Sequence, residues 1–373
     1  MVVGKTNVYS AIVLQGGGAL GAYEYGVLKA LYEQRPGFRP VAVAGISIGA
    51  ITAAVLGGAK EDPIRSLDRL WRNKLTVSAG WPLPAMIDQS LAVLGNPGMY
   101  RPQADLLIAP WALTSFYDTS PLRETLTDLV DPVTLNDDAT RVVVGATNVG
   151  TGEMEFFDRD TPGGLTFEHV AASGSLPPSF PMTRIAGQAY WDGGLFSNTP
   201  LSPAIDALEK AAGGDPSAVR ELIVIELFSM NAPIPRQLSE VFQRMVRLQY
   251  TSRLKLDKKF FDKIDEVVDL VEKLEQSLPE SSDIRQDPAY QELRSYRKIN
   301  HFNVVTSNLS AKLSNAGDFS QSSVNARIDA GYHDAIAQGI GRVDAPMLDF
   351  GITSPRAAQE PASSTAPFSY VSS

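Results

Sequence analysis

The segment VAVAGISIGAITAAVLGGA, from Val41 to Ala59, decides how the first part of this chain folds. It carries no charge and is close to the length of about 20 residues that a membrane-spanning helix needs. However, it is rich in Gly, Ser and Thr, and it divides into an apolar run, a Gly-Ile-Ser-Ile-Gly turn and a second apolar run. We therefore interpret it as a buried strand, a sharp turn at Ser47 and a helix, not as a membrane span.

The residues before this segment repeat the same order of elements. YSAIVLQ, at 9–15, is a short apolar run that stops at three glycines, and AYEYGVLKALYEQ, at 22–34, has its apolar residues at helical spacing. Strand, helix, strand and helix within about fifty residues indicate a parallel sheet with helices on its faces. Further patterns predict strands at 141–149, 221–228 and 301–308, a helix at 201–213 and a closing helix from about residue 322. We expect an α/β fold of three αβα layers around a mostly parallel central sheet.

Two stretches depart from this pattern. The charged segment from Pro235 to Pro279 contains no internal Pro or Gly, and a predicted strand follows it, so we expect a helical insertion at about 235–298 within a domain of residues 1–345. The last residues, 346–373, are rich in Pro, Ala and Ser and predict a disordered tail.

Composition limits the classes of function. With 44% apolar and 20% charged residues, the 373-residue chain can bury a large core, and its formal charge of −9 argues against nucleic acid as a partner. The chain has no cysteine, which excludes disulfides, thiolate metal sites and a thiol nucleophile. The N-terminus lacks the long apolar core of a signal peptide, so we predict a cytoplasmic protein. The sequence does not indicate the oligomeric state.

The glycine-rich stretch GGGALG, at 16–21, has two interpretations. It fits the G-x-G-x-x-G pattern of dinucleotide-binding proteins, but the second predicted strand ends at Ser47 and not at the carboxylate that would hold a ribose. The other interpretation is an anion-binding loop, in which the N–H groups of Gly17 and Gly18 lie beside Ser47 at the carboxyl edge of the sheet. A nucleophile and an oxyanion hole would then meet, as acyl transfer requires. Nucleotide binding remains the alternative.

The base that would activate Ser47 is the next question, since a serine hydroxyl is inert until its proton is removed. His169 lies near a helix start and fits a packing or surface role, while His301 opens a strand and His333 lies within a helix. Asp192, in YWDGGLFSNTP, is the stronger candidate, because the two glycines after it allow a sharp turn that displays the carboxylate. The same DGG could also be only a turn.

Together, these motifs resemble the patatin-like phospholipase family, in its bacterial branch. QGGGALG resembles the oxyanion loop of the family, GISIG its nucleophile elbow and DGGLFSNTP its catalytic-aspartate motif. AASGSLPPSFPM, before the aspartate, and GDFSQSSVNARIDAGYHDAIAQG, near the end, are also similar, so the resemblance covers most of residues 8–342. Any one motif alone would be weak evidence, but the three in order are specific.

The resemblance implies a serine hydrolase acting on carboxylic esters of lipids, of phospholipase A, lysophospholipase or carboxylesterase type, without cofactor or metal. Ser47 would be the nucleophile and Asp192 the base of a Ser–Asp dyad. The resemblance implies an oxyanion hole formed by Gly16, Gly17, Gly18 and Ile48. It also implies that four further glycines support the motifs: Gly45, Gly49, Gly193 and Gly194. Many members of the family carry an acid at the position of Gln15 and a cation at that of Leu20, and the missing cation weakens the case for a phosphate head group. A catalytically silent lipid-binding scaffold is a further alternative.

The segment 244–263 suggests contact with a membrane. It alternates apolar residues such as Met245 and Leu248 with basic residues such as Arg244 and Arg247, and a basic amphipathic helix can lie in a membrane interface. The competing interpretation is that its apolar stripe packs onto the domain. We therefore predict two possible roles for 244–263, peripheral membrane association and packing onto the domain.

Overall fold

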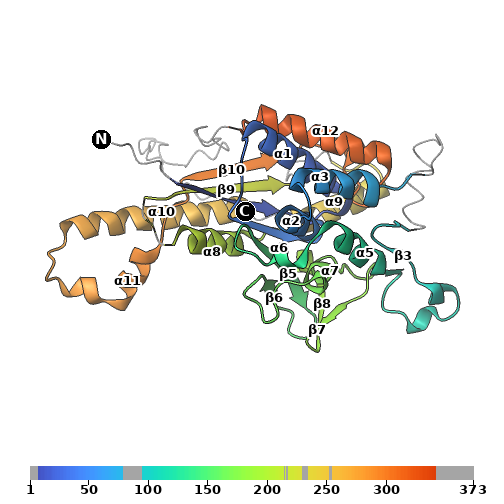
Figure 1. The fold of residues 1–373 in the computed structure, drawn as a ribbon, viewed down its shortest axis with the longest axis horizontal. Coiled ribbons are helices and arrows are strands. Elements are labelled where there is room, and N and C mark those ends of the chain that lie inside the picture. Colours follow the sequence, from blue (N-terminus) through green and yellow to red (C-terminus); the bar gives the residue numbers. More distant parts are fainter. Residues whose placement is uncertain are drawn as a thin grey trace, which may run out of the picture.

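The computed structural model describes residues 7–78, 95–213, 215, 217–228, 234–251 and 254–341, so the tail predicted at 346–373 lies outside the described residues. Its main feature is an eight-stranded sheet in the order β10-β9-β1-β2-β5-β8-β7, with β6 also paired to β5 (Figure 1). The strands are β1 (Val8–Leu14), β2 (Ala42–Ile46), β5 (Arg141–Asn148), β6 (Met154–Phe157), β7 (Thr183–Ile185), β8 (Gln188–Asp192), β9 (Val219–Glu226) and β10 (His301–Thr306).

Five neighbouring strands, from β10 to β5, pair in parallel, and β6, β8 and β7 add an antiparallel edge. The predicted mostly parallel sheet is therefore confirmed. A separate short pair consists of β3 (Arg101–Pro102) and β4 (Tyr117–Asp118).

Helices cover both faces of the sheet. They are α1 (Gly21–Gln34), α2 (Ile48–Gly58), α3 (Pro63–Arg69), α5 (Ser120–Leu129), α6 (Pro132–Leu135), α7 (Phe167–Ser173), α8 (Leu201–Ala212), α9 (Leu238–Tyr250), α10 (Leu254–Ser277), α11 (Pro288–Ser295) and α12 (Gln321–Ala337). Short 3₁₀ or π turns accompany them, among them η1 (Gly18–Leu20) and η6 (Gly193–Leu195).

The alternation of side chains along each strand creates the layers. On β1, Ile12 and Leu14 point into a core shared with α1, α2 and α12, whereas Ala11 and Val13 point into a second core shared with α8. Figure 1 shows α1 and α12 side by side above the sheet and α8 below it. The three-layer αβα prediction is confirmed.

The segment from Val41 to Ala59 forms β2 and the 11-residue helix α2, as the sequence predicts. All but one of the α2 residues are buried, so its apolar composition reflects the protein core. Among the residues that the structure describes, no helix is both long enough and apolar enough to cross a membrane. The cytoplasmic location stays a prediction.

The predicted insertion is helical. Between β9 and β10 the chain forms α9, α10, the turn η7 (Asp283–Gln286) and α11, and α10 buries Val268 and Val271. Figure 1 shows α11 at the far end of α10, away from the sheet. The domain limits themselves stay a prediction.

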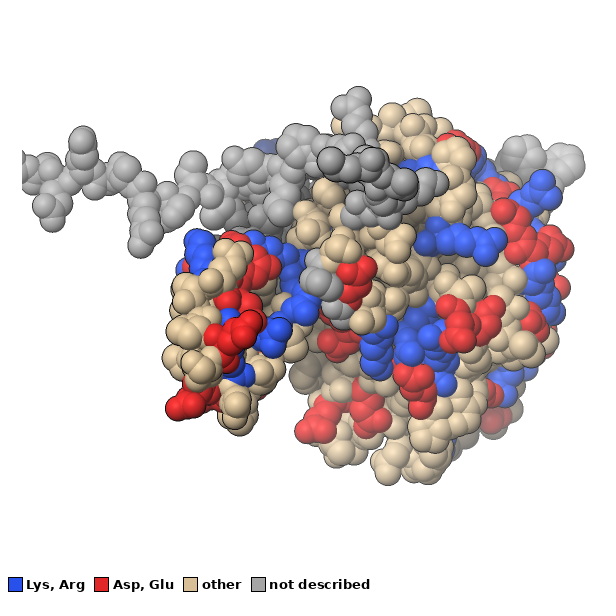
Figure 2. Space-filling model, turned by 60° about the vertical axis from the view of Figure 1, so that its left-hand side comes forward, with Lys and Arg blue, Asp and Glu red and all other residues tan. Residues whose placement is uncertain are grey.

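Surface charge is mixed on the face seen from the α10–α11 side. Figure 2 shows Lys and Arg interspersed there with Asp and Glu. A nucleic-acid backbone would need a broad positive surface, and this face does not have one.

Candidate active site

Ser47 occupies a strained turn between β2 and α2. Its backbone has φ 55° and ψ −121°, a conformation that residues other than glycine rarely adopt. A Cβ atom on Gly45 would lie 2.2 Å from the carbonyl oxygen of Gly49, so the strand can turn back into the helix this closely only with glycine at 45. The local sequence therefore folds into a sharp strand-to-helix elbow, with Ser47 at the N-terminus of α2.

Ser173, the last residue of α7, holds the elbow in place. Its buried hydroxyl accepts a hydrogen bond from the Ser47 N–H group (2.9 Å) and donates one to the carbonyl oxygen of Gly145 on β5 (2.6 Å). The elbow is thereby fixed to the neighbouring strand. Ser173 lies within the stretch AASGSLPPSFPM, but nothing in the sequence alone marks it as a contact of Ser47.

Asp192 ends β8, one strand away from the elbow. Its Cα pairs with Ala146 on β5, next to Gly145, which pairs with Ile46 on β2. Asp192 is 2% exposed, and its carboxylate accepts a hydrogen bond from the Gly194 N–H group (2.7 Å). Gly193 allows β8 to lie this close to β5, since a Cβ there would be 2.5 Å from the Gly145 oxygen. The DGG sequence thus presents the carboxylate and is more than a surface turn.

Burial changes the acidity of Asp192. It raises the pKa of the carboxyl group from 3.8 to about 6, and hydrogen bonds from the Ser47 side chain and the Gly194 N–H group act in the opposite direction. The Ser47 side chain thus lies close enough to the carboxyl group to lower its pKa. A carboxylate with a pKa near 6 accepts a proton more readily than an exposed aspartate does, yet it remains ionised at pH 7.

The glycine loop lies directly against Ser47. A Cβ atom on Gly16 would be 3.0 Å from the Ser47 Cβ, and Gly18 has a φ of 55°. Among the described residues, no hydrogen-bond acceptor is assigned to the N–H groups of Gly17, Gly18 and Ile48. Since Gly17 and Gly18 precede α1 and Ile48 begins α2, these donors suit an anion beside Ser47.

Gly16 differs from the other expected oxyanion donors. Its N–H group donates to Asn198 Oδ1 (3.0 Å), and Asn198 Nδ2 donates back to the Gly16 carbonyl oxygen (3.0 Å). The N–H group of Gly16 is thus already used, and this residue contributes through its missing side chain. Asn198 is a site residue that sequence analysis missed, although DGGLFSNTP contains it.

The glycine loop is covered on one side. The Ala19 N–H group donates to the Ala316 carbonyl oxygen (2.8 Å), and a Cβ on Gly18 would lie 2.5 Å from the same oxygen, so the chain near Ala316 covers one side of the loop.

The two positions that differ from the family pattern have structural roles. The Gln15 side chain hydrogen-bonds to Thr199 and to the Leu227 N–H group, and Leu20 is buried.

The three histidines lie in other surroundings. His169 is buried, its ring centroid is 4.4 Å from that of Phe157, and Nδ1 contacts Thr166, so of the two predicted roles, packing or surface, it has the packing role. His301 begins β10 in register with Glu221, at the end of the parallel strands opposite to Ser47. His333 lies on α12, its ring edge-on to Tyr332 at 5.8 Å.

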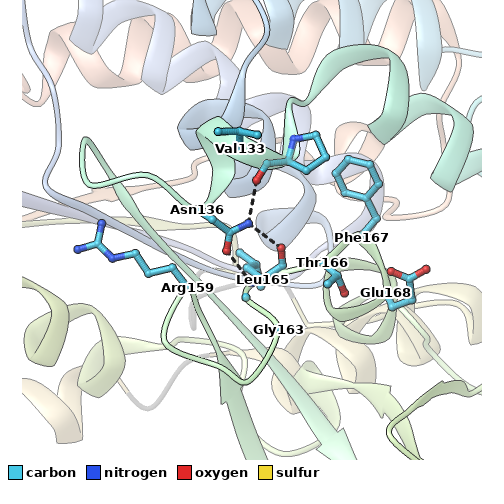
Figure 3. Close-up of a pocket in the computed structure, with 10 residues that line it drawn as sticks. Val133, Asn136, Arg159, Gly163, Leu165, Thr166, Phe167 and Glu168 are labelled. Carbon is cyan, nitrogen blue, oxygen red and sulfur yellow. Dashed lines mark hydrogen bonds between the residues drawn. The ribbon is translucent and has the colours of Figure 1, made fainter.

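A separate pocket of about 540 Å³ opens where the N-terminal end of α7 meets α6 (Figure 3). Asn136 spans its floor: Nδ2 donates to the carbonyl oxygens of Pro132 and Leu165, and Oδ1 accepts from the Leu165 N–H group. None of the predicted catalytic residues lines this pocket. Within the described residues, no three His, Asp or Glu side chains gather as metal ligands would.

Comparison with known proteins agrees with the motifs. Residues 12–205 match the model of the patatin-like phospholipase family, and residues 248–338 match a model described as patatin phospholipase. The chain is 30% identical over 223 residues to a cGAMP-activated phospholipase of Pseudomonas aeruginosa (strain BWHPSA011 / Pa011). That alignment covers 54% of this chain and 60% of the relative, so the chain matches less than two thirds of it.

Similar solved structures include VipD from Legionella pneumophila, with 13% identity, a TM-score of 0.42 and coverage of 89% of this chain and 66% of that one. ExoU of Pseudomonas aeruginosa, solved with SpcU, has 20% identity and a TM-score of 0.30, covering 67% of this chain and 51% of that one. The 12–205 match spans more than half of the 373 residues and contains the elbow, the glycine loop and the aspartate motif. The chain therefore belongs to the patatin-like phospholipase family.

Proposed function

We propose that this protein is a lipid acyl hydrolase that cleaves carboxylic esters with Ser47 as nucleophile and Asp192 as base. The observation that carries the proposal is the buried Asp192 carboxylate, whose pKa is about 6 and is lowered by the side chain of Ser47, a serine held on a strained turn. The family membership supports the same class of reaction.

In the proposed first step, Asp192 takes the proton of the Ser47 hydroxyl while the oxygen attacks the carbonyl carbon of the ester. The carbonyl oxygen becomes negative and accepts hydrogen bonds from the N–H groups of Gly17, Gly18 and Ile48. When this intermediate collapses, the carbon–oxygen bond to the alcohol breaks, and the alcohol leaves with the proton from Asp192. The acyl group remains on Ser47.

The second half repeats the chemistry with water. Asp192 takes a proton from water, the resulting hydroxide attacks the acyl carbon, and the same N–H groups hold the negative oxygen. The bond to Ser47 then breaks, the serine regains its proton and the carboxylic acid departs. No cofactor or metal is needed for any of these steps, and no histidine takes part.

The substrate class is tested by hydrolysis of a panel of lipids. We expect the wild-type protein to release fatty acid from at least one of phosphatidylcholine, lysophosphatidylcholine, diacylglycerol and p-nitrophenyl butyrate, and the Ser47→Ala variant to release none above background. Fatty-acid release is followed by mass spectrometry. A folded wild-type protein that cleaves none of them, and whose Ser47 resists a fluorophosphonate probe, would instead indicate a silent lipid-binding scaffold.

We also propose that the protein contacts membranes through the segment 244–263. Met245 and Leu248 on α9 are 59% and 54% exposed, so this part of the stripe does not pack onto the domain. Leu238 and Val241 extend the same exposed stripe, and the arginines at 244 and 247 lie on the same helix. An apolar stripe beside positive charges matches the interface of an anionic membrane. The side chains of residues 252–262 lie outside the described residues.

Vesicle co-sedimentation at low salt tests this contact. We expect the Met245→Asp/Leu248→Asp variant to bind phosphatidylglycerol-containing vesicles at least about tenfold more weakly than the wild type, because each exposed apolar side chain gains about 1.5–3 kcal/mol on burial. Ile284→Asp is the matched control, since Ile284 is 51% exposed on η7. Equal binding by all three proteins would contradict the proposed contact.

A further inference from the structure

Tyr250, the last residue of α9, brings the helical insertion to the catalytic centre. A Cβ atom on Gly194 would lie 3.0 Å from Tyr250 Cε1 and 3.1 Å from Asp192 Oδ1, so the phenol ring and the catalytic carboxylate border the same glycine. Burial and the charge of Asp192 together raise the pKa of Tyr250 to about 12. Tyr250 lies outside the 12–205 match and near the start of the second match, at 248–338.

Two contacts hold Tyr250 in this position. Its carbonyl oxygen accepts a hydrogen bond from Asn198 Nδ2 (3.3 Å), the same amide that pairs with Gly16 in the oxyanion loop. Its ring stacks on Phe228, with 5.9 Å between centroids and 28° between planes. Phe228 is itself buried beside the loop, since a Cβ on Gly17 would be 3.5 Å from Phe228 Cε2. Tyr250 and Phe228 thus form an aromatic wall from the glycine loop to Asp192.

The chemistry of the proposed reaction indicates which part of the substrate meets Tyr250. The negative oxygen of the intermediate points to the N–H groups of Gly17 and Gly18. The departing alcohol must approach Asp192, because Asp192 supplies its proton. The Tyr250 ring stands on this Asp192 side, next to Gly194.

We infer that Tyr250 is the specificity-determining residue for the alcohol part of the ester, and that its ring excludes bulky alcohols from the Asp192 side of the site. This inference rests on the proposed function. Hydrophobic pockets discriminate groups that differ by single carbon atoms by about 10–200-fold, so one aromatic ring is large enough to decide which alcohols fit.

The inference is tested with two series of esters. The first varies the alcohol, comparing methyl butyrate with 3,3-dimethylbutyl butyrate, and the second varies the acid, comparing methyl butyrate with methyl octanoate. We expect Tyr250→Ala to raise the kcat/KM ratio of the bulky-alcohol ester to methyl butyrate at least about tenfold over the wild type. We expect the octanoate-to-butyrate ratio to change less than about threefold. Tyr250→Phe keeps the ring and should keep both ratios.

A second readout separates this role from a purely structural one. If the ring keeps water from Asp192, Tyr250→Ala lowers the pKa of the carboxyl group, and the acidic limb of the pH–rate profile shifts to lower pH, while Tyr250→Phe leaves it in place. If the alanine variant does not fold, Tyr250→Leu replaces it, because leucine keeps an apolar side chain. We expect this variant to raise the kcat/KM ratio of the bulky-alcohol ester to methyl butyrate in the same direction, by a smaller factor.

The inference is overturned if Tyr250→Ala or Tyr250→Leu hydrolyses esters with an unchanged alcohol ratio, or if the acid ratio moves as much as the alcohol ratio. An inactive wild-type protein would contradict the Ser47–Asp192 proposal as well. An active wild-type protein, whose activity is lost in Ser47→Ala but whose alcohol selectivity ignores position 250, would contradict the Tyr250 inference alone.

Discussion

Ser47→Ala is expected to lose ester hydrolysis almost completely, with kcat lower by at least about 10³-fold, as happens when the nucleophile of a serine hydrolase is removed. The reason is that the variant lacks the Ser47 oxygen that would receive the acyl group. Attack by water could then be assisted only by substrate binding and by the N–H groups near Gly17. The fold should survive, because the elbow is held by a hydrogen bond from the backbone N–H group of residue 47 to the Ser173 hydroxyl. Turnover of p-nitrophenyl butyrate and labelling by a fluorophosphonate probe measure the effect.

Ser202→Ala is a suitable control, because Ser202 is an exposed serine on α8. It should keep the wild-type rate and the wild-type labelling. If Ser47→Ala were folded by circular dichroism and still hydrolysed the ester at more than about a tenth of the wild-type rate, Ser47 would not be the nucleophile.

Asp192→Asn should reduce kcat by about 10³–10⁴-fold, comparable to the loss when a triad aspartate is changed to asparagine. The amide fills the same space and can still accept the Gly194 N–H hydrogen bond, but it cannot take the serine proton. In the wild type the base must be ionised. Activity should therefore fall about tenfold for each pH unit below the pKa of about 6 and level off above it. The residual activity of the variant should not show this limb.

The same substitution should raise stability. Folding raises the Asp192 pKa from 3.8 to about 6, so ionisation disfavours the folded state as pH rises between these values, and the cost is complete above about pH 6. At 1.36 kcal/mol per pKa unit, the neutral amide relieves about 3 kcal/mol at pH 7 and almost nothing below pH 3.8. Denaturant unfolding of both proteins at the two pH values measures this difference.

The control for the base is His301→Ala, which should keep its activity, since His301 lies at the opposite end of the parallel strands. A loss as large as that of Asp192→Asn would favour a triad with histidine. A wild-type pH profile without an acidic limb near 6 would contradict Asp192 as the base.

The sequence predicts the parallel part of the fold well because its strands are buried on both faces. β5 and β9 are runs of almost uniformly buried residues, and such runs stand out from the polar turns around them. The antiparallel strands β6 and β7 were not predicted. They have three or four residues and are partly exposed, so their sequences carry no strong pattern, and only their pairing with β5 and β8 defines them.

The motifs also gave most of the candidate site, because the elbow and the DGG turn are local structures that need glycine at fixed positions. The missed residues act across long distances in the sequence. Asn198 meets Gly16 over 182 positions, and Tyr250 reaches Asp192 from a helix that the three motifs do not include. Such contacts depend on how the insertion packs on the sheet, and no spacing in a single sequence records that.

The elbow fixes position 47 through close backbone contacts around Gly45 and Gly49. A hydrogen bond from the backbone N–H group of residue 47 to the Ser173 hydroxyl also holds it. None of these contacts depends on the Ser47 hydroxyl itself. A cysteine introduced at 47 would therefore stand where the serine stands, and in a chain with no other thiol it would be the unique attachment point for a spectroscopic label. The geometry of the turn thus makes this centre directly observable in solution.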